Sequence, residues 1–409
     1  MNKRPHILLV FLFLFSISAS AQVEADISRP SINAEQFGFA LKAETALNKG
    51  QLSLSIPLME LPGKGYNLPI SLTFYSGDVN ACAEASPIGL GWALNAGGVI
   101  AATIKGTEDI EDYVFNGNND HFKDPEYIEK AARDVYCYDS IDRIRQNSMP
   151  DEYTYSLPGH SGTIEISLDE NKTIKKTLFP DESYKIEDTQ RGYCITADDG
   201  TKFYFEAAER RVTGSVPFES TESTSYFLTS IKTIKGGEFK FHYADEDYFD
   251  LSMIREAKKE SDMFHTKRIT KIESVGFGCV TFGASSRNDR GNIGRWAIDE
   301  NHKSMRIDTI ELRDKDGYLI KGYELDNSGT FKLIDEKGDE PNNDWYNCRQ
   351  KLSSITQYDS AGNRLPPYRF TYDYQFSKSR PQSYYVYDTD SEGYYIPYDS
   401  WTSNGGAQA

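Results

Sequence analysis

The sequence predicts an all-β fold in which antiparallel hairpins are stacked into one or two sheets, with a short helical insertion near residues 124–146. Three observations support this prediction. Several segments alternate apolar and polar residues, glycine-bearing turns separate them at short intervals, and the chain is rich in aromatic residues, with 27 Tyr and 22 Phe. Alternation with a period of two and aromatic side chains are both typical of strands that bury one face.

The first residues resemble an export signal rather than part of the fold. Two basic residues precede an apolar run over residues 7–17, and residues 19–21 (Ala-Ser-Ala) match a small-x-small cleavage site. The run is shorter than the ~20 residues that a membrane-spanning helix needs. We therefore expect a signal peptide over residues 1–21, no membrane span after its removal, and a mature chain that starts at Gln22 and is secreted or held at the cell surface or in the periplasm.

A β region with a Gly-rich segment is expected over residues 22–123. QLSLSIPL, from Gln51, and LPISLTFY, from Leu68, both alternate and are separated by a Pro/Gly-rich turn. The apolar residues fall on one face of each expected strand: Leu52, Leu54 and Ile56 in the first, and Ile70, Leu72 and Phe74 in the second. The two segments are therefore predicted to be antiparallel neighbours.

The helical insertion is expected over residues 124–149. This segment is rich in helix-forming residues, Asp124 suits an N-cap, and Pro125 suits the first helical position.

Short strands and turns return over residues 150–380. DDG at 198–200, GG at 236–237 and DKDG at 314–317 are typical hairpin turns. A loose repeat accompanies them, because segments of the form [LI]-x-x-I begin at Leu228, Ile269, Ile307 and Leu352, each followed by a glycine-bearing turn and an aromatic-rich strand. We interpret this as serial addition of similar hairpins, against the alternative that any β-rich chain yields such hairpins. Residues 381–409 form an acidic, Tyr/Gly/Ser-rich tail that is expected to be irregular.

Composition excludes several function classes. The chain has 45 Lys+Arg and 62 Asp+Glu, a formal net charge of −17, so nucleic acid is an unsuitable partner. The five cysteines contain no CxxC pair, and their odd number leaves at least one thiol unpaired or intermolecular. The six histidines show no HxH or HExxH spacing, so no catalytic zinc site is predicted.

The segment SPIGLGWALNAGGVI, residues 86–100, raises the question of a nucleotide site. A dinucleotide loop requires a third glycine where Leu94 stands, and no Gly-Lys-Ser/Thr follows. We therefore interpret Gly89 and Gly91 as bending points beside Trp92, Gly97-Gly98 as a turn between strands, and Trp92 as a buried core anchor. The alternative is an exposed Trp92 that stacks on a sugar.

Two further motifs resemble functional sites. GHSG at 159–162 lacks the second glycine of a nucleophile elbow, because Thr163 occupies its place, so Ser161 is not expected to be catalytic. In the tail, Asp388, Asp390, Glu392 and Asp399 approximate a calcium loop, but its last position carries Asp and Pro397 interrupts it. Calcium binding there stays open against a solvated loop. No catalytic, cofactor or metal-binding residue is predicted, no cofactor is expected, and the chain is not expected to be an enzyme.

Three blocks resemble secreted bacterial RHS/YD-repeat proteins: residues 50–109 with IGLGWALNAGG, residues 150–166 (PDEYTYSLPGHSGTIEI), and YDSAGNRL from Tyr358. Members of this family are large β-built proteins, some of which wrap strands into a hollow shell around a toxic C-terminal segment. The sequence lacks a long run of YD repeats, a shell-closing motif and a toxin region. The resemblance therefore implies the front end of such a protein, that is, a partial shell.

The expected function is a non-enzymatic, exported structural or interaction module that binds a protein partner or itself through β edges. The last strand is expected over residues 368–374, with nothing obvious to cover its edge. The alternative is a carbohydrate-binding or carbohydrate-processing surface protein with a glycan ligand. An exposed row of Tyr and Trp on one sheet face would favour the alternative, whereas rings packed inside would favour the scaffold.

Overall fold

The computed structural model describes residues 27–28, 30–36, 53–76, 84–105, 151–168, 174–213, 220–249, 263–291, 298–332, 348–372, 387–389 and 395–397. The chain divides into two compact units, residues 1–28 with 104–151, and residues 29–103 with 152–409. In the first unit, β1 (Ile27–Ser28) pairs with the last two residues of β5 (Val99–Lys105). The expected signal peptide and the expected helix near 124–146 lie outside the described residues.

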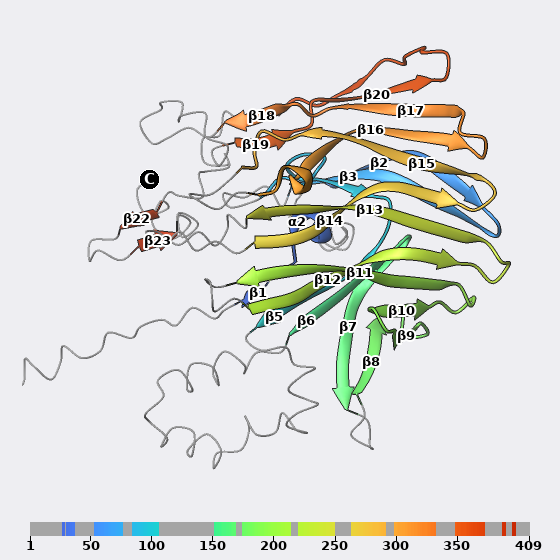
Figure 1. Cartoon of the computed structure of the whole chain (residues 1–409), viewed down its shortest axis with the longest axis vertical. Coiled ribbons are helices and arrows are strands. Elements are labelled where there is room, and N and C mark those ends of the chain that lie inside the picture. Colours follow the sequence, from blue (N-terminus) through green and yellow to red (C-terminus); the bar gives the residue numbers. More distant parts are fainter. Residues whose placement is uncertain are drawn as a thin grey trace, which may run out of the picture. The chain divides into compact units, whose positions relative to one another are not determined.

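The second unit confirms the all-β prediction, and every ladder between its named strands is antiparallel. Its main sheet runs in the order β21-β20-β17-β16-β15-β14-β11-β12-β5-β6-β7-β8, with β10 and β9 branching from β11, and with β13 pairing with both β12 and β14 (Figure 1). The strands of this sheet besides β5 are β6 (Glu152–Leu157), β7 (His160–Leu168), β8 (Ile174–Phe179), β9 (Lys185–Asp188), β10 (Tyr193–Thr196), β11 (Lys202–Thr213), β12 (Ser220–Lys232), β13 (Glu238–Phe249), β14 (Met263–Ser274), β15 (Gly278–Ser286), β16 (Met305–Asp314), β17 (Leu319–Asp326), β20 (Ser354–Asp359) and β21 (Tyr368–Arg369).

Three smaller sheets accompany the main one. They are formed by β2 (Ser53–Gly63), β3 (Tyr66–Tyr75) and β4 (Trp92–Asn95), by β18 (Gly329–Lys332) and β19 (Cys348–Lys351), and by β22 (Tyr387–Thr389) and β23 (Tyr395–Pro397). Helix is confined, among the described residues, to α2 (Ile32–Glu35) and the 3-10 turn η5 (Glu300–His302). No described helix has the length and apolar character needed to cross a membrane.

The predicted hairpin of β2 and β3 is confirmed, and Leu54 and Ile56 lie on the predicted face opposite Phe74 and Leu72, but the start of β2 is not buried. Leu54 pairs with Phe74 as expected, yet its side chain is 41% exposed, and Leu52 lies outside the described residues. Burial begins at Leu58 and Met59, where the ladder carries one extra residue on β2. Such a bulge rotates the strand, so the alternation before it does not continue after it.

Register places six hairpin turns at one end of the second unit, the end that faces right in Figure 1. The turns follow β2, β10, β12, β14, β16 and β20. The predicted turns at 198–200, 236–237 and 314–317 are among them and are confirmed. All six turns carry a glycine in the left-handed region, with φ between 76° and 88°: Gly65, Gly200, Gly236, Gly276, Gly317 and Gly362. Only glycine adopts this conformation without steric cost, which is why these short turns are recognisable in the sequence.

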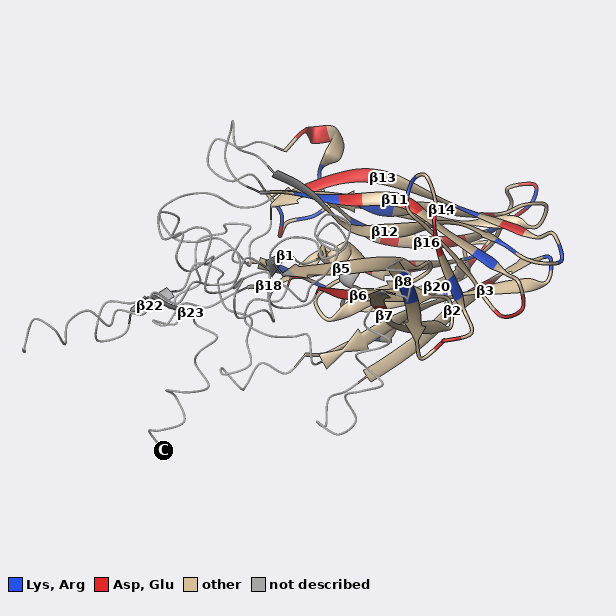
Figure 2. Cartoon of the chain, turned by 90° about the horizontal axis from the view of Figure 1, so that it is seen from below, with Lys and Arg blue, Asp and Glu red and all other residues tan. Residues whose placement is uncertain are grey.

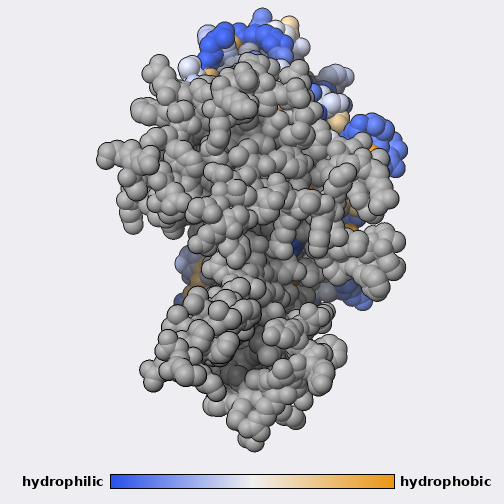
Figure 3. Space-filling model, turned by 90° about the vertical axis from the view of Figure 1, so that its left-hand side faces the viewer, coloured by the Kyte–Doolittle hydropathy of each residue, from blue (hydrophilic) through white to orange (hydrophobic). Residues whose placement is uncertain are grey.

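Aromatic rings fill the interior rather than cover a sheet face. Trp92, Tyr155, Tyr248, Phe205, Phe227 and Phe239 are among the largest fully buried side chains. Where Figure 3 shows described residues, at the rim of that view, most of them are hydrophilic. By the criterion set above, the packed rings favour a scaffold.

Candidate functional site

The repeated [LI]-x-x-I segments share one backbone feature. Both apolar positions of all four segments are buried: Leu228, Ile231, Ile269, Ile272, Ile307, Ile310, Leu352 and Ile355. In a regular strand, residues three apart point to opposite faces of the sheet. One additional residue between them restores a common face. The ladders therefore need an irregularity inside each segment.

The ladders show this irregularity at the second position. Ser230 pairs with Tyr204 and Leu228 pairs with Phe205, so Thr229 has no partner of its own. Thr270 is skipped in the same way on β14, and Asp308 on β16. On β20 the ladder begins at Ser354, and the N–H of Ser353 donates to the carbonyl of Asp326 at 2.7 Å.

Hydrogen bonds from the bulged side chains hold two of these positions. The hydroxyl of Thr229 donates to the carbonyl of Tyr204 at 3.0 Å, and the hydroxyl of Thr270 donates to the carbonyl of His242 at 3.1 Å. The second position of each segment carries a small polar residue. This is a signal for a bulge that was not recognised in the sequence.

The Gly-rich segment docks onto these bulged strands. The N–H of Leu228 donates to the carbonyl of Gly98 at 3.0 Å, and the N–H of Ile307 donates to the carbonyl of Pro87 at 2.9 Å. Both donors are first positions of [LI]-x-x-I segments, next to a bulge that interrupts the ladder. A β-bulge leaves backbone groups unpaired within the sheet. The two sequence signatures, separate in the chain, therefore meet in the fold.

A third contact lies at the last repeat. The N–H of Leu90 donates to the carbonyl of Gln350 at 2.9 Å, and a Cβ on Gly89 would stand 3.0 Å from the nitrogen of Leu352. We call the set formed by residues 86–98, the bulged segments and Gln350 the bulge junction. Two glycines make the approach possible: Gly91 has a φ of 73°, and a Cβ on Gly98 would stand 2.4 Å from the carbonyl of Ser156. Gly97-Gly98 links β4 to β5, which lie in different sheets.

Trp92 is the anchor of the bulge junction, as the sequence predicted. Its side chain is 1% exposed, and its ring centroid lies 5.3 Å from that of Phe74 and 4.6 Å from that of Phe370. The indole N–H donates to the hydroxyl of Tyr372 at 2.9 Å. The alternative of a Trp92 that stacks on a sugar is wrong, because no face of the ring reaches solvent.

A buried ion pair supports the junction from the end of β15. The Nε and Nη2 atoms of Arg287 donate to the two carboxylate oxygens of Asp289 at 2.9 and 3.0 Å, and the N–H of Gln350 also donates to Asp289 at 2.9 Å. Arg287 further donates to the carbonyl of Ala85. Burial opposes ionisation of Asp289, but Arg287, Arg290 and the Gln350 N–H outweigh it and lower its pKa to about 2.

The prediction of a last strand over residues 368–374 is wrong in its length. The last strand of the main sheet is β21, of two residues, rather than a strand over 368–374. It pairs with β20 at Ser354 and Ile355, and a single bridge joins Tyr358 to Arg364. Beyond β21 the chain turns inward, which is why Phe370 and Tyr372 reach Trp92 instead of extending the strand.

At the opposite end of the strand order, side-chain contacts connect β8 to β9 and β10. Lys176 on β8 forms an ion pair with Asp188 on β9, and its ammonium group lies 4.7 Å from the centre of the Tyr193 ring on β10. Because β9 and β10 branch from β11, this contact joins the two ends of the strand series from β11 to β8. Among the described pairings, β8 has a ladder only with β7 and β9 only with β10, so these strands are edges of the main sheet as well as β20–β21.

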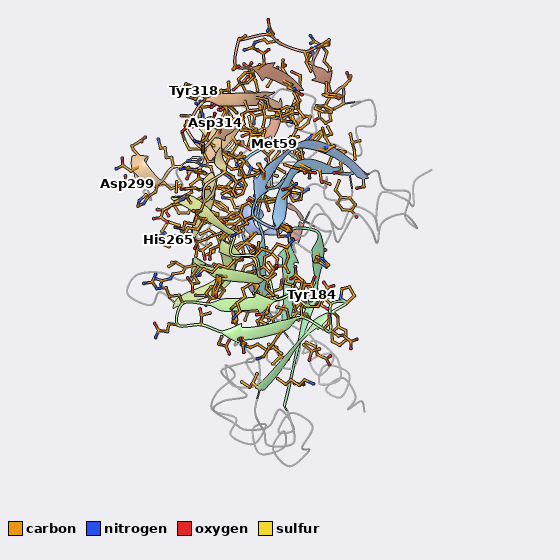
Figure 4. All side chains as sticks on the ribbon, turned by 90° about the vertical axis from the view of Figure 1, so that its right-hand side faces the viewer. Met59, Tyr184, His265, Asp299, Asp314 and Tyr318 are labelled. Carbon is orange, nitrogen blue, oxygen red and sulfur yellow. The ribbon has the colours of Figure 1, made fainter. Side chains whose placement is uncertain are left out.

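Two histidines share a carboxylate on β13, whose run of acidic residues is red in Figure 2. Nδ1 of His265 lies 2.8 Å from Oδ1 of Asp247, and Nδ1 of His302 lies 3.3 Å from Oδ2. The hydrogen bond with Asp247 raises the pKa of His265, while burial, Arg210 and Lys267 act against it. Figure 4 shows His265 near the segment labelled Asp299, which caps η5.

The remaining residues singled out from the sequence lie apart from the bulge junction. Ser161 lies on β7 opposite Ser156, while the neighbouring His160 contacts Asp181 and Tyr184. Cys194 and Cys279 have free thiols. Within the described ranges, no three metal-ligating side chains are grouped to hold an ion. Asp390, Glu392 and Asp399 lie outside the described residues, and Asp388 is described only as part of the backbone of β22.

No protein-family model and no curated protein matches the chain. Among solved structures it is similar to TcdB2-TccC3-TEV, with 14% identity and a TM-score of 0.39 over 79% of this chain and 16% of that one. It is also similar to the Photorhabdus luminescens Tc holotoxin pore, with 12% identity and a TM-score of 0.37 over 79% and 16%. It is also similar to the N-terminal domain of the effector protein SpvB from Salmonella typhimurium strain LT2. The identity is 11% and the TM-score 0.37, over 74% of this chain and 99% of that domain.

The chain thus spans about a sixth of the length of the Tc chains that it matches. Similarity at these levels does not show a family for the chain.

Proposed function

We propose that the chain is a non-enzymatic, exported structural or interaction module, of the kind expected at the front of an RHS/YD-repeat protein. Its partner is a β element of a second copy, which adds to the β20–β21 edge. The observation that carries this proposal is that edge, which is incompletely paired and bears exposed apolar side chains. The serial, bulged hairpins and the buried bulge junction support a scaffold role. The apolar residues of the Gly-rich segment and of the [LI]-x-x-I repeats pack in the interior and are not available to bind a ligand.

The apolar side chains gather on the three outermost strands and their turns. Tyr318 is 74% exposed, Ile320 51%, Leu365 56% and Tyr368 63%; Figure 4 shows Tyr318 near one end of the view. Single exposed apolar residues are ordinary, whereas a group at an incomplete sheet edge is typical of an interface.

The edge is also only partly protected against pairing. The returning segment donates the N–H of Leu365 to the carbonyl of Gln357 and the N–H of Phe370 to the carbonyl of Ser353. Between these donors, Pro366 and Pro367 have no N–H to offer. A strand from a second copy can therefore pair in register beside residues 356–359 only after it displaces this segment, which favours slow, concentration-dependent association.

Light scattering of the full mature chain over a range of concentrations tests the proposal. We expect self-association, and we expect the double substitution Leu365→Lys and Tyr368→Lys to abolish it, because charge at an edge opposes strand pairing. Ile234→Lys is the matched control, since Ile234 is 73% exposed but lies in the turn after β12. A monomer at all concentrations, or equal effects of both variants, would overturn the proposal.

Carbohydrate binding is the competing outcome of the same experiment. Binding of the wild-type chain to a glycan array, lost in Tyr368→Lys without any change in association state, would support the surface-protein alternative. Absence of glycan binding together with loss of self-association supports the scaffold.

A further inference from the structure

The N-terminal segment of the second unit, residues 30–36, occupies a gap in the main sheet. β12 pairs with β13 only from Ser230 to Lys232, while β14 crosses to β11 at residues 210–212. Past Lys240, β13 has no strand partner on the β12 side, and an isolated bridge joins its Asp247 to Lys303. The segment with α2 lies in this gap beside β14, as Figure 1 shows.

Glu209, fully buried on β11, is the centre of the contact. Its carboxyl oxygens accept five hydrogen bonds, from the backbone N–H and the hydroxyl of Ser31 and from the hydroxyls of Thr224, Ser225 and Thr266. Three of these donors belong to the sheet and two to Ser31. No Lys or Arg side chain is among the donors.

Three additional hydrogen bonds fix the rest of the segment. The N–H of Ile32 donates to the hydroxyl of Tyr248 at 3.1 Å, and the amide of Asn33 donates to the carbonyl of Lys267 at 3.4 Å. The side-chain carbonyl of Gln36 accepts from the N–H of Leu94 at 3.1 Å. We call the receiving surface, formed by Glu209, Thr224, Ser225, Tyr248 and Thr266, the Ser31 slot.

The slot, rather than the segment, determines this arrangement. A helix of four residues has no stability of its own in water. No ladder joins the residues of α2 to a strand among the described pairings, so the contacts are those of a bound peptide. A pocket lined by Asn33, Gln36, Phe227 and Tyr243 remains beside the segment. An empty slot would leave the buried Glu209 without two of its five donors, which is costly.

We propose that the Ser31 slot, filled in this structure by the chain's own residues 30–36, is a sequence-specific peptide-binding site that accepts the same residues from a second copy of the chain. Exchange of an identical segment between copies is a low-cost route to assembly, because every contact is reproduced in the exchanged form. This inference does not rest on the β20–β21 edge.

Two complementary variants of the full chain test exchange between copies. Ser31→Ala leaves the slot intact and impairs the segment, whereas Glu209→Gln leaves the segment intact and impairs the slot. Both are made with Leu365→Lys and Tyr368→Lys, so that edge pairing does not contribute. We expect native mass spectrometry to detect a mixed one-to-one dimer only after the two variants are combined. Homodimers alone, or no mixed species, would overturn the proposal.

A peptide assay examines the slot directly. A fluorescent peptide of residues 29–37 is added to the Ser31→Ala chain, and anisotropy is compared with that of the same peptide carrying Ser31→Ala. We expect the wild-type peptide to bind at least about 10-fold more tightly, the effect of one hydrogen bond to a carboxyl group. Equal binding would contradict the inference.

If the Ser31→Ala chain does not fold alone, its refolding yield is measured with each peptide. A higher yield with the wild-type peptide supports the slot as a receptor, and equal yields count against it.

Discussion

The indole N–H of Trp92 donates a hydrogen bond to the hydroxyl of Tyr372, 2.9 Å away and 280 residues later in the chain. Tyr372 in turn donates to the carbonyl of Leu352 at 2.7 Å, at the first position of the last [LI]-x-x-I segment. Burial raises the pKa of the Tyr372 hydroxyl, so it stays protonated and able to donate at neutral pH. The Gly-rich segment, the last repeat and the returning segment are therefore stabilised together.

Trp92→Ala is expected to lower the free energy of unfolding by about 3–5 kcal/mol, the usual effect of deleting a large buried aromatic side chain. Urea denaturation followed by circular dichroism measures this change. Tyr318→Ala, at a side chain that is 74% exposed, is the control and should change stability by less than about 0.5 kcal/mol. An unchanged midpoint for Trp92→Ala would contradict the burial of the ring.

Tyr372→Phe keeps the ring and removes the hydroxyl that serves both hydrogen bonds. We expect a loss of about 1–3 kcal/mol, because the indole N–H of Trp92 is left buried without a partner. Hydrogen exchange of that indole N–H, observed by NMR, should accelerate in the variant. Unchanged exchange would show that Tyr372 does not protect it.

Deletion of Thr270 tests the bulge. Without this residue, Ile269 and Ile272 are two positions apart, so a regular strand keeps both isoleucines on the buried face, and the cost is only that of the lost hydrogen bond, about 0.5–1.5 kcal/mol. Thr270→Ala keeps the extra residue and loses only the hydrogen bond to His242, about 0.5–1.5 kcal/mol. Similar losses for the deletion and the substitution are therefore expected in urea denaturation, whereas a loss of about 2–5 kcal/mol for the deletion alone would argue against the bulge as the reason for the three-residue spacing.

His265 should make stability depend on pH. Its folded pKa is raised above the ordinary value of 6.5, chiefly by the hydrogen bond with Asp247. The stabilisation is therefore complete below about pH 6.5 and is lost as the pH rises through the folded pKa. We expect His265→Gln to remove more stability at about pH 5.5 than at about pH 8. His242→Gln, whose side chain lies 3.7 Å from Glu273, is the control, and an equal loss at both pH values for His265→Gln would refute the prediction.

Asp289 should make stability depend on pH in the opposite direction from His265. Its pKa is lowered to about 2 from the ordinary 3.8, so its stabilisation is present above about pH 3.8 and is lost as the pH falls toward 2. Asp289→Asn should cost about 3–5 kcal/mol near neutral pH, because it leaves Arg287 buried and uncompensated. Glu187→Gln breaks an exposed ion pair with Lys185, which solvent screens, so it should lower the free energy of unfolding far less. Equal effects of the two substitutions in urea denaturation would contradict this prediction.

Local chemistry explains which parts of the fold were predictable. The turns at 198–200, 236–237 and 314–317 depend on glycines that no other residue replaces easily, and Trp92 lies in a segment without charge. The bulges depend instead on which strand lies opposite, so the role of Thr229 and Asp308 appears only in the ladders. Leu54 lies on the predicted face opposite Phe74 but near the start of β2, where it is 41% exposed, and a periodic pattern does not tell which part of a strand the core covers.

The bulge junction itself could not have been predicted from local pattern. Gly98 and Leu228, like Pro87 and Ile307, are far apart in the chain, and only the order of the strands brings them together. The short length of β21 has the same origin, since Phe370 and Tyr372 gain more from the interior beside Trp92 than from a continued ladder.

The placement of the turns has a consequence for changes in chain length. At the turn end each connection is a few residues long and fixes the register of two strands, so an insertion after Gly276 would displace the β14–β15 ladder. The connections over residues 250–262 and 287–304 join strands at the other end, where β13 pairs with β14 and β15 with β16. A reporter peptide placed within 250–262 should therefore leave every ladder intact. The connection over 287–304 differs, because it holds the buried Arg287–Asp289 pair, so the β13–β14 connection is where evolution or an engineer can add sequence without disturbing the strand register.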